Sequence, residues 1–116
     1  MVKNDEYYTL KTLDEINLII KYADGLTVDD FQQQPAVLDG IVFRMIQMSE
    51  HMNSISEEFK LQHPDVKWVN IKGFRNRLVH NYGGVNLDFV YNAISIDIPE
   101  LKLLLTNIID HEFKNK

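Results

Sequence analysis

The residues best suited to chemistry lie in one basic stretch, which reads Gly-Phe-Arg-Asn-Arg-Leu-Val-His-Asn-Tyr over residues 73–82. Arginine binds anions through a planar fork of donors, and histidine exchanges a proton near neutral pH. On a helix, at about 100° per residue, Arg75 borders the apolar side. Asn76 and His80 are four residues apart, so they lie one above the other on an adjacent polar flank. Tyr82 falls on nearly the same side of the helix as Arg75.

An arginine at the edge of a core needs a partner, because burying an unpaired charge is very costly. The expected internal partner of Arg75 is Glu50, which follows apolar residues at helical spacing and so borders the packed face of its own helix. Spacing alone leaves two interpretations open. Either Arg75 and Glu50 form a structural ion pair and His80 is an ordinary hydrogen-bonding side chain, or Arg75 lines a wet cleft that an anion can enter.

The positive charge of this stretch contrasts with an acidic chain. The 116 residues carry 12 Lys and Arg against 17 Asp and Glu, which gives a net charge of −5. Lys67, Lys72, Arg75 and Arg77 all fall within residues 66–82, where there is no acidic residue. The acidic whole argues against nonspecific binding of nucleic acid, but a local basic segment can still form a groove that faces phosphate. The alternative is a solvated helix face, and Arg77 is expected to point away from the apolar side.

Composition excludes several classes of protein. There is no cysteine, so the chain has no disulfide scaffold, no thiolate metal site and no cysteine nucleophile, and it suits the reducing cytoplasm. No apolar run approaches the roughly 20 residues that span a bilayer, and Met1–Lys11 is charged and lacks the apolar stretch of a signal peptide. The histidines outside the basic stretch show no metal-ligand spacing. We therefore expect a cytoplasmic protein with no metal, no other cofactor and no membrane contact.

Apolar residues recur at helical spacing along the chain, which predicts one all-α domain over residues 1–116. The expected architecture is an antiparallel bundle of about five helices joined by short connections. Asp65 and Asn86 are the expected N-caps of the third and fourth helices, and Pro99 fits the first turn of the last. The predicted helices span about 5–23, 36–55, 65–80, 86–94 and 99–113, with a short turn over 27–31.

Three methionines, Met45, Met48 and Met52, form a stripe on the second predicted helix, where they are expected to fill the core or an interface rather than hold a metal or cofactor. Together with the helix that carries the basic stretch, they would offer more apolar surface than a small monomer easily covers. This predicts a two-fold symmetric dimer with the segment 75–80 near the axis.

The same stretch resembles a known family. Arg75, His80 and Tyr82 match the R-x4-H-x-Y pattern of the HEPN superfamily, and residues 75–80 read like the "RNRLVH" of its HepT-like toxin branch. Other segments resemble that branch in the same order: Gly25-Leu26-Thr27 before Phe31, Met48-Ser49-Glu50, Ile55–Phe59, His63-Pro64 before Trp68, and Ile98–Leu101. The resemblance covers about Leu10 to Ile109. Ser49 departs from the usual glycine, and Gly83-Gly84 replaces an aromatic-glycine pair.

The resemblance implies a toxin of a toxin–antitoxin system of the type II or VII kind. Such a protein is a homodimer that cuts RNA without a metal ion, at a composite cleft where two motif helices meet. It implies that Arg75 and His80 are the catalytic pair and that Asn76 positions Arg75 or the scissile phosphate, with Glu50, Arg77 and Lys72 in support. His80 would activate the 2′-hydroxyl and Arg75 would stabilise the phosphate.

The resemblance also implies a cognate partner, a minimal nucleotidyltransferase antitoxin that silences the toxin by adenylylating Tyr82. Two other functions fit the sequence. The chain could be a non-catalytic helical subunit that binds a nucleotidyltransferase or recruits its substrate. It could also be a purely structural dimer. Intact Arg75, Asn76 and His80 favour the enzyme over both.

Overall fold

The computed structural model describes residues 3–68, 71–82 and 87–114. Its description of the helix over residues 71–82 does not extend to five side chains, those of Ile71, Lys72, Val79, Asn81 and Tyr82. The described residues form helices and connecting turns without a strand, which confirms the all-α class.

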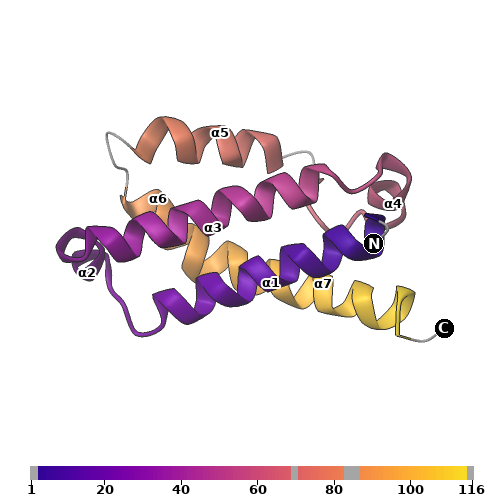
Figure 1. The fold of residues 1–116 in the computed structure, drawn as a ribbon, viewed down its shortest axis with the longest axis horizontal. Helices are drawn as coiled ribbons and strands as arrows, with labels where there is room; N and C mark the ends of the chain where they lie inside the picture. Colours follow the sequence, from indigo (N-terminus) through magenta and orange to yellow (C-terminus); the bar gives the residue numbers. More distant parts are fainter. Residues whose placement is uncertain (1–2, 69–70, 83–86, 115–116) are drawn as a thin grey trace.

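Four helices alternate in direction along a body of 46 × 27 × 25 Å (Figure 1). They are α1 (Asp5–Ala23), α3 (Pro35–Asn53), α5 (Ile71–Tyr82) and α7 (Ile98–Glu112). Three short helices lie at their ends: α2 (Val28–Gln33), α4 (Glu57–Gln62) and α6 (Leu87–Asn92). The packing joins α1 to both α3 and α7, whereas α5 packs chiefly on α3. Among the described residues, other helices therefore cover α5 chiefly on one side, and its opposite side is left open.

The first two helices have the ends that their sequences specify. Asn4 caps α1 by accepting a hydrogen bond from the backbone of Tyr7, and Gly25 adopts a φ of 74° just after the helix ends. Thr27 and Asp30 form a reciprocal capping box that starts α2. The predicted bounds of α1 are confirmed. They could be predicted because the residues that start and end this helix lie next to its ends in the sequence.

The start of α5 differs from the prediction. Asp65 is not its N-cap, because α5 begins at Ile71 and the chain from His63 to Trp68 forms a loop. Val66 is buried, and the Trp68 indole donates a 2.8 Å hydrogen bond to the carbonyl of His63. These contacts hold the segment in a non-helical path. The expected cap at Asn86 lies outside the described residues.

The last two predicted helices are joined by a π-helical segment, η2 (Ala93–Asp97). Pro99 lies in the first turn of α7, as predicted. Proline cannot donate a backbone hydrogen bond, and its ring crowds the carbonyl four residues earlier. Instead, the backbone N–H of Ile98 donates to the carbonyl of Ala93, five residues back. The π turn thus takes the chain past Pro99 without breaking the helix.

The methionine stripe is interior, which overturns one argument for a dimer. Met45, Met48 and Met52 are at most 2% exposed and belong to the apolar core of the single chain. Thr9, Thr12 and Ser49 are completely buried as well, and each hydroxyl donates to the carbonyl four residues earlier. Ser49, which departs from the usual glycine of the family, thus has its hydroxyl hydrogen-bonded within its own helix.

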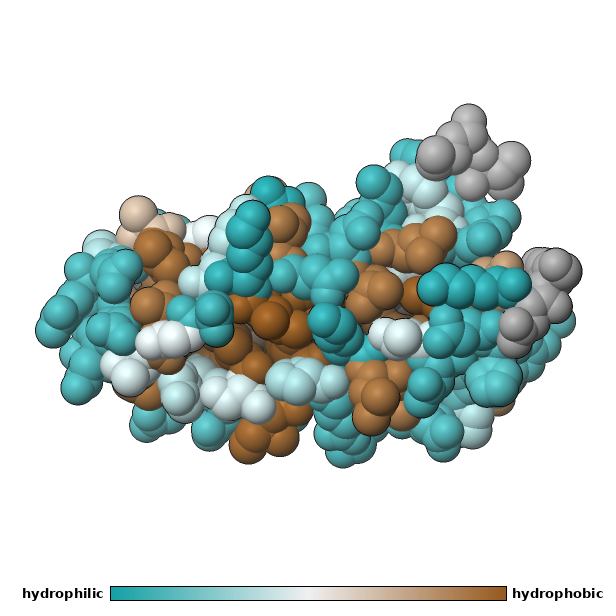
Figure 2. All heavy atoms as spheres, turned by 90° about the horizontal axis from the view of Figure 1, so that it is seen from below, coloured by the Kyte–Doolittle hydropathy of each residue, from teal (hydrophilic) through white to brown (hydrophobic). Residues whose placement is uncertain are grey.

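Some apolar side chains remain outside the core. Figure 2 shows a band of apolar atoms along the middle of one face, flanked by hydrophilic side chains. Large apolar side chains exposed on the described surface are Leu10, Tyr22, Phe43, Leu61, Ile96 and Leu103. Among the helices described, none is long and apolar enough to cross a membrane.

The start of α1 is fastened to the start of α4 by one carboxylate. Asp5 accepts hydrogen bonds from the backbone N–H of Ser56, at 2.8 Å, and from its hydroxyl, at 2.7 Å. Ser56 in turn caps α4 by accepting from the backbone of Phe59. This contact fixes the α3–α4 connection that precedes the loop to α5.

We predict that Asp5→Ala lowers the free energy of unfolding by roughly 1–2 kcal/mol, because it removes both bonds to an exposed carboxylate. Urea unfolding followed by circular dichroism measures this. Asp14→Ala is the control, since Asp14 lies exposed on the same helix without a described partner. Equal stability of the two variants would show that the contact with Ser56 contributes nothing.

Candidate active site on α5

Helix α5 presents one apolar side to the bundle and one polar side to solvent. Leu78 is 1% exposed, and Phe74 packs half-buried against the core. Asn76 and His80 are exposed. The helical spacing of these residues therefore gives the amphipathic arrangement that the sequence predicts.

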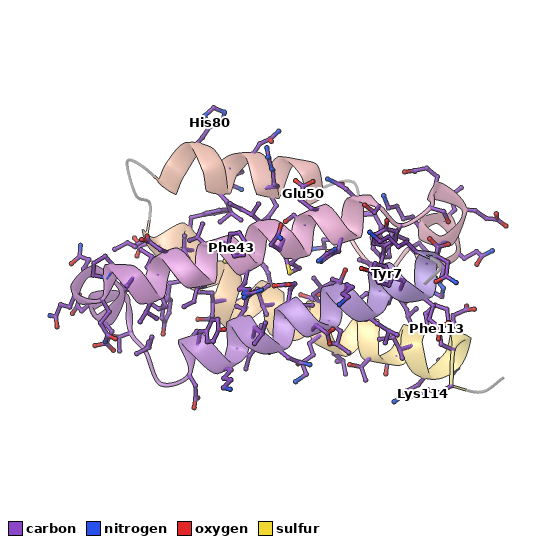
Figure 3. The ribbon with its side chains drawn as sticks, viewed as in Figure 1. Tyr7, Phe43, Glu50, His80, Phe113 and Lys114 are labelled. Carbon is purple, nitrogen blue, oxygen red and sulfur yellow. The ribbon has the colours of Figure 1, made fainter. Side chains whose placement is uncertain are left out.

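The predicted ion pair between Arg75 and Glu50 is present. Nε of Arg75 lies 3.2 Å from Oε1 of Glu50, which projects from α3 toward α5 (Figure 3). The side chains are 40% and 51% exposed, so the pair lies at the surface edge of the α3–α5 contact rather than in the interior. An exposed pair of this kind adds little to stability. It does hold one edge of the guanidinium while leaving the rest accessible to an anion.

Asn76 lies beside the guanidinium. Nη1 of Arg75 donates to Oδ1 of Asn76 at 3.4 Å. Glu50 and Asn76 thus contact different nitrogens of one side chain and restrict its orientation. A guanidinium that is oriented in advance loses less freedom when it binds a phosphate.

The side chain of His80 is exposed to solvent. Its imidazole projects away from the bundle (Figure 3), and it makes no hydrogen bond or ion pair within the described part of the chain. Arg75 and His80 do not contact each other. Within one chain the structure therefore brings Arg75, Asn76 and Glu50 together and leaves His80 separate on the outer side of α5.

Arg77 is expected to point away from the apolar side of α5, and its side chain is exposed but makes one aromatic contact. Its guanidinium carbon lies 4.2 Å from the ring centre of Phe89 on α6. This cation–π contact bridges α5 to the next helix. The side chains of Lys72 and Tyr82, which the sequence also singles out, are not among those that the structure describes.

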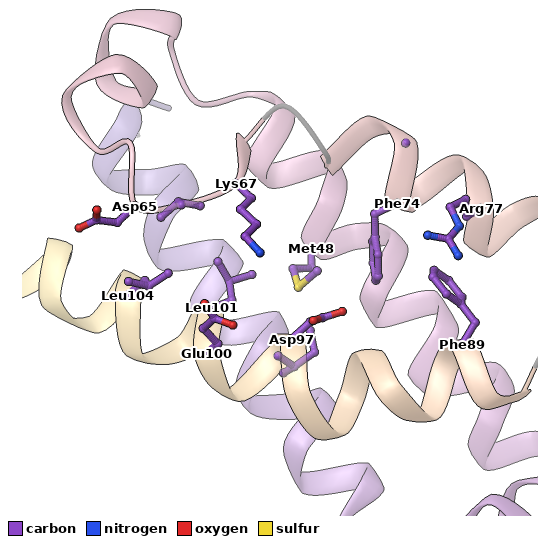
Figure 4. A pocket seen from close by; sticks show the side chains of 13 residues that line it. Met48, Asp65, Lys67, Phe74, Arg77, Phe89, Asp97, Glu100, Leu101 and Leu104 are labelled. Atoms are coloured by element: carbon purple, nitrogen blue, oxygen red, sulfur yellow. The ribbon is translucent and has the colours of Figure 1, made fainter.

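A cavity of about 560 Å³ lies between α5, the end of α3 and the η2–α7 turn. Figure 4 shows Phe74 and Arg77 reaching into it from α5, opposite Asp97. Sequence reasoning missed Asp97 and Glu100, because they follow Lys67 by about thirty residues along the chain. Lys67 and Arg77, two of the four cations within residues 66–82, were the sequence signal for one side of this cavity.

Within the described residues, no group of three or more His, Asp or Glu side chains is placed to hold a metal ion. The groups that the site does offer are an oriented cation and an accessible imidazole. Together these can bind an anionic phosphate and move a proton.

The sequence was compared with protein families and with known proteins. The family described as ribonuclease HepT-like matches residues 12–108. A protein of Caldanaerobacter subterraneus subsp. tengcongensis, named "Putative RNase TTE0752", is 29% identical over 111 residues, which are 96% of this chain and 99% of the relative.

Two archaeal proteins are also similar. "Probable ribonuclease HepT" of Thermococcus cleftensis is 24% identical over 88% of this chain and 93% of its own length. "Gamma-glutamylcyclotransferase and putative RNase MJ0434" of Methanocaldococcus jannaschii is 28% identical over all of this chain, which spans only 52% of that relative. No solved structure matches the chain. Because the family match covers most of its length, the chain belongs to the ribonuclease HepT-like family.

Proposed function

We propose that this protein is a metal-independent endoribonuclease whose catalytic groups are Arg75 and His80. The observation that carries the proposal is the state of Arg75, which Glu50 and Asn76 orient while the side chain stays 40% exposed. An arginine that served only to pair with Glu50 would not need Asn76 beside it. Nor would it need, on the same helix, an exposed histidine that has no partner among the described side chains. Membership of the ribonuclease HepT-like family supports the proposal.

In the proposed reaction, His80 accepts the proton of a ribose 2′-hydroxyl, and the 2′-oxygen attacks the adjacent phosphorus. The bond from phosphorus to the 5′-oxygen breaks, and this oxygen leaves with a proton from a protonated imidazole or water. Arg75 binds the negative charge that develops on the phosphate oxygens. The products are a 2′,3′-cyclic phosphate and a 5′-hydroxyl. Asn76 and Glu50 act as positioning residues, and Lys72 and Arg77 attract the RNA backbone.

We further infer a homodimer in which each catalytic centre is composite. Arg75 leans toward α3 and His80 projects outward, and the two do not touch within one chain. A two-fold axis near α5 would set Arg75 of one copy opposite His80 of the other. The buried methionines take no part in this inference, which rests on the separation of the two groups.

The biological role that we propose is that of a cytoplasmic toxin with a minimal nucleotidyltransferase as its antitoxin. Adenylylation of Tyr82 would place a bulky anion on the helix that carries Arg75, where it competes with the RNA backbone. The alternative is a non-catalytic subunit of the nucleotidyltransferase. The Arg75–Glu50 ion pair is compatible with it, because a purely structural arginine would form the same pair.

We predict that His80→Ala and Arg75→Ala each lower RNA cleavage by at least about 100-fold, because each removes one of the two catalytic groups. Cleavage of a labelled RNA by purified protein in EDTA measures this, and the wild-type protein should be unaffected by the chelator. His111→Ala is the control, since His111 is exposed on α7. Activity that survives His80→Ala, or that requires Mg²⁺, would refute the mechanism.

The composite centre predicts complementation between inactive variants. In an equal mixture of Arg75→Ala and His80→Ala chains, half of the dimers pair unlike chains. Each such dimer keeps one centre with an intact Arg75 and an intact His80, so activity should recover to about a quarter of wild type. Light scattering confirms the dimer, and an equal mixture of wild type with the double variant is the control. A dimeric but inactive mixture would place both groups of a centre on one chain.

Adenylylation predicts a mass change that depends on Tyr82. Co-expression with the proposed partner, a minimal nucleotidyltransferase, should add one or more adenylyl units to the intact protein, and Tyr82→Phe should remove this addition and restore toxicity. Intact-mass spectrometry measures the modification, and Tyr91→Phe serves as the control on α6. A partner that neutralises the unmodified protein would show steric inhibition instead.

A further inference from the structure

The cavity beside α5 is lined by charged side chains of both signs. Lys67 and Asp65, from the α4–α5 loop, and Arg77, from α5, lie on one side, while Asp97 and Glu100, from the η2–α7 turn, lie on the other (Figure 4). Lys67, Asp97 and Glu100 form no hydrogen bond or ion pair within the described part of the chain. These three side chains are free to bind a ligand that carries both acceptors and donors.

Between the charged walls the cavity is apolar and aromatic. The rings of Phe74 and Phe89 have centroids 5.7 Å apart at 45°, and Met48 and Leu101 complete the lining nearby. A volume of about 560 Å³ falls within the usual range of small-molecule sites, roughly 300–1,000 Å³. Flat bases of single-stranded RNA bind surfaces of this composition by stacking on aromatic side chains.

The carboxylates and cations that line the cavity favour one base over the others through their hydrogen-bonding groups. A carboxylate only accepts hydrogen bonds, and guanine alone presents two adjacent donors, N1–H and the 2-amino group, on its Watson–Crick edge. Guanine also carries the acceptors O6 and N7, which suit a lysine or arginine. Uracil has a single donor between two acceptors, and adenine and cytosine each offer one amino group beside an acceptor.

We propose that this cavity binds a guanine base of the RNA substrate next to the bond that is cleaved, an inference that rests on the proposed function. Asp97 or Glu100 accepts from N1–H and the 2-amino group, and Lys67 donates to the acceptor edge. Phe74 supplies the stacking surface.

The cavity adjoins the polar flank of α5. Gly73 and Arg77 line it and are four residues apart, and His80 follows Arg77 by three, so these positions are neighbours along one side of the helix. An RNA strand that crosses the outer side of α5 at His80 therefore passes the cavity mouth. The site would fix which phosphodiester bond reaches the catalytic groups.

Gly73 allows the cavity to be closed without damage to the fold. A Cβ built at this glycine meets nothing within 4 Å, and leucine is a far better helix former than glycine. Gly73→Leu thus places a side chain at the cavity wall while favouring α5. Gly40→Leu is the matched control, because Gly40 is also a helical glycine with open space at its Cβ but lies on α3, away from this cavity.

The test titrates guanosine, inosine, adenosine, cytidine and uridine into the ¹⁵N-labelled full chain by NMR. Guanosine should bind at least tenfold more tightly than the others and shift the backbone amides of Phe74, Asp97 and Leu101. Inosine, which lacks only the 2-amino group, should lose most of this advantage. Gly73→Leu should abolish binding, Asp97→Asn with Glu100→Gln should erase the preference, and Gly40→Leu should bind like wild type.

Cleavage of RNAs that differ in the position of a single guanine provides a second measurement. The cut should move with the guanine, and Gly73→Leu should lose this dependence. Cleavage without base preference, together with no guanosine shifts at the cavity, would overturn the guanine site and leave the ribonuclease intact. Guanosine binding at the cavity by a protein that cuts no RNA would refute the proposed function and uphold the guanine site.

Discussion

The one-sided packing of α5 is the constraint on which the candidate site depends. Helix α5 lies chiefly on α3, and of its described side chains only Leu78 is fully buried. The Arg75–Glu50 pair adds a polar contact at the edge of this packing. A helix enclosed on all sides could not expose His80 or border a cavity, so the exposed polar flank of α5 exists because the bundle leaves this helix partly uncovered.

This arrangement separates the elements that give stability from those that give chemistry. The buried part of α1 and α3 holds the methionines of α3 and the hydroxyls of Thr9, Thr12 and Ser49, each of which donates a hydrogen bond within its own helix. The polar side chains of α5 contribute little to that core, since they are exposed. Substitution of Asn76 or His80 should therefore change folding stability little, because exposed side chains on a rigid scaffold take little part in its packing.

The sequence predicts the elements whose signals are local. The caps and spacing of α1 and the position of Pro99 are readable along the chain, and so is the pairing of Arg75 with Glu50, because both border apolar faces. The start of α5 was misplaced because Asp65 follows a proline like a typical cap, whereas the buried Val66 and the Trp68 indole hold that segment as a loop. The contact of Arg77 with Phe89, and the burial of the methionine stripe within one chain rather than at an interface, were not predictable for a related reason. What covers a face depends on other helices, and helical spacing cannot show which face is covered.

The π turn of η2 sets how α6 and α7 are related. It holds one residue more per turn than an α-helix does, so it changes the phase between the two segments by about 100°. Asp97 and Glu100 face the cavity in that phase. A relative that lacked the extra residue would present different side chains at the same place in space. Among homologous chains, the composition of this wall should therefore follow insertions and deletions near Ala93–Asp97 more closely than it follows point substitutions.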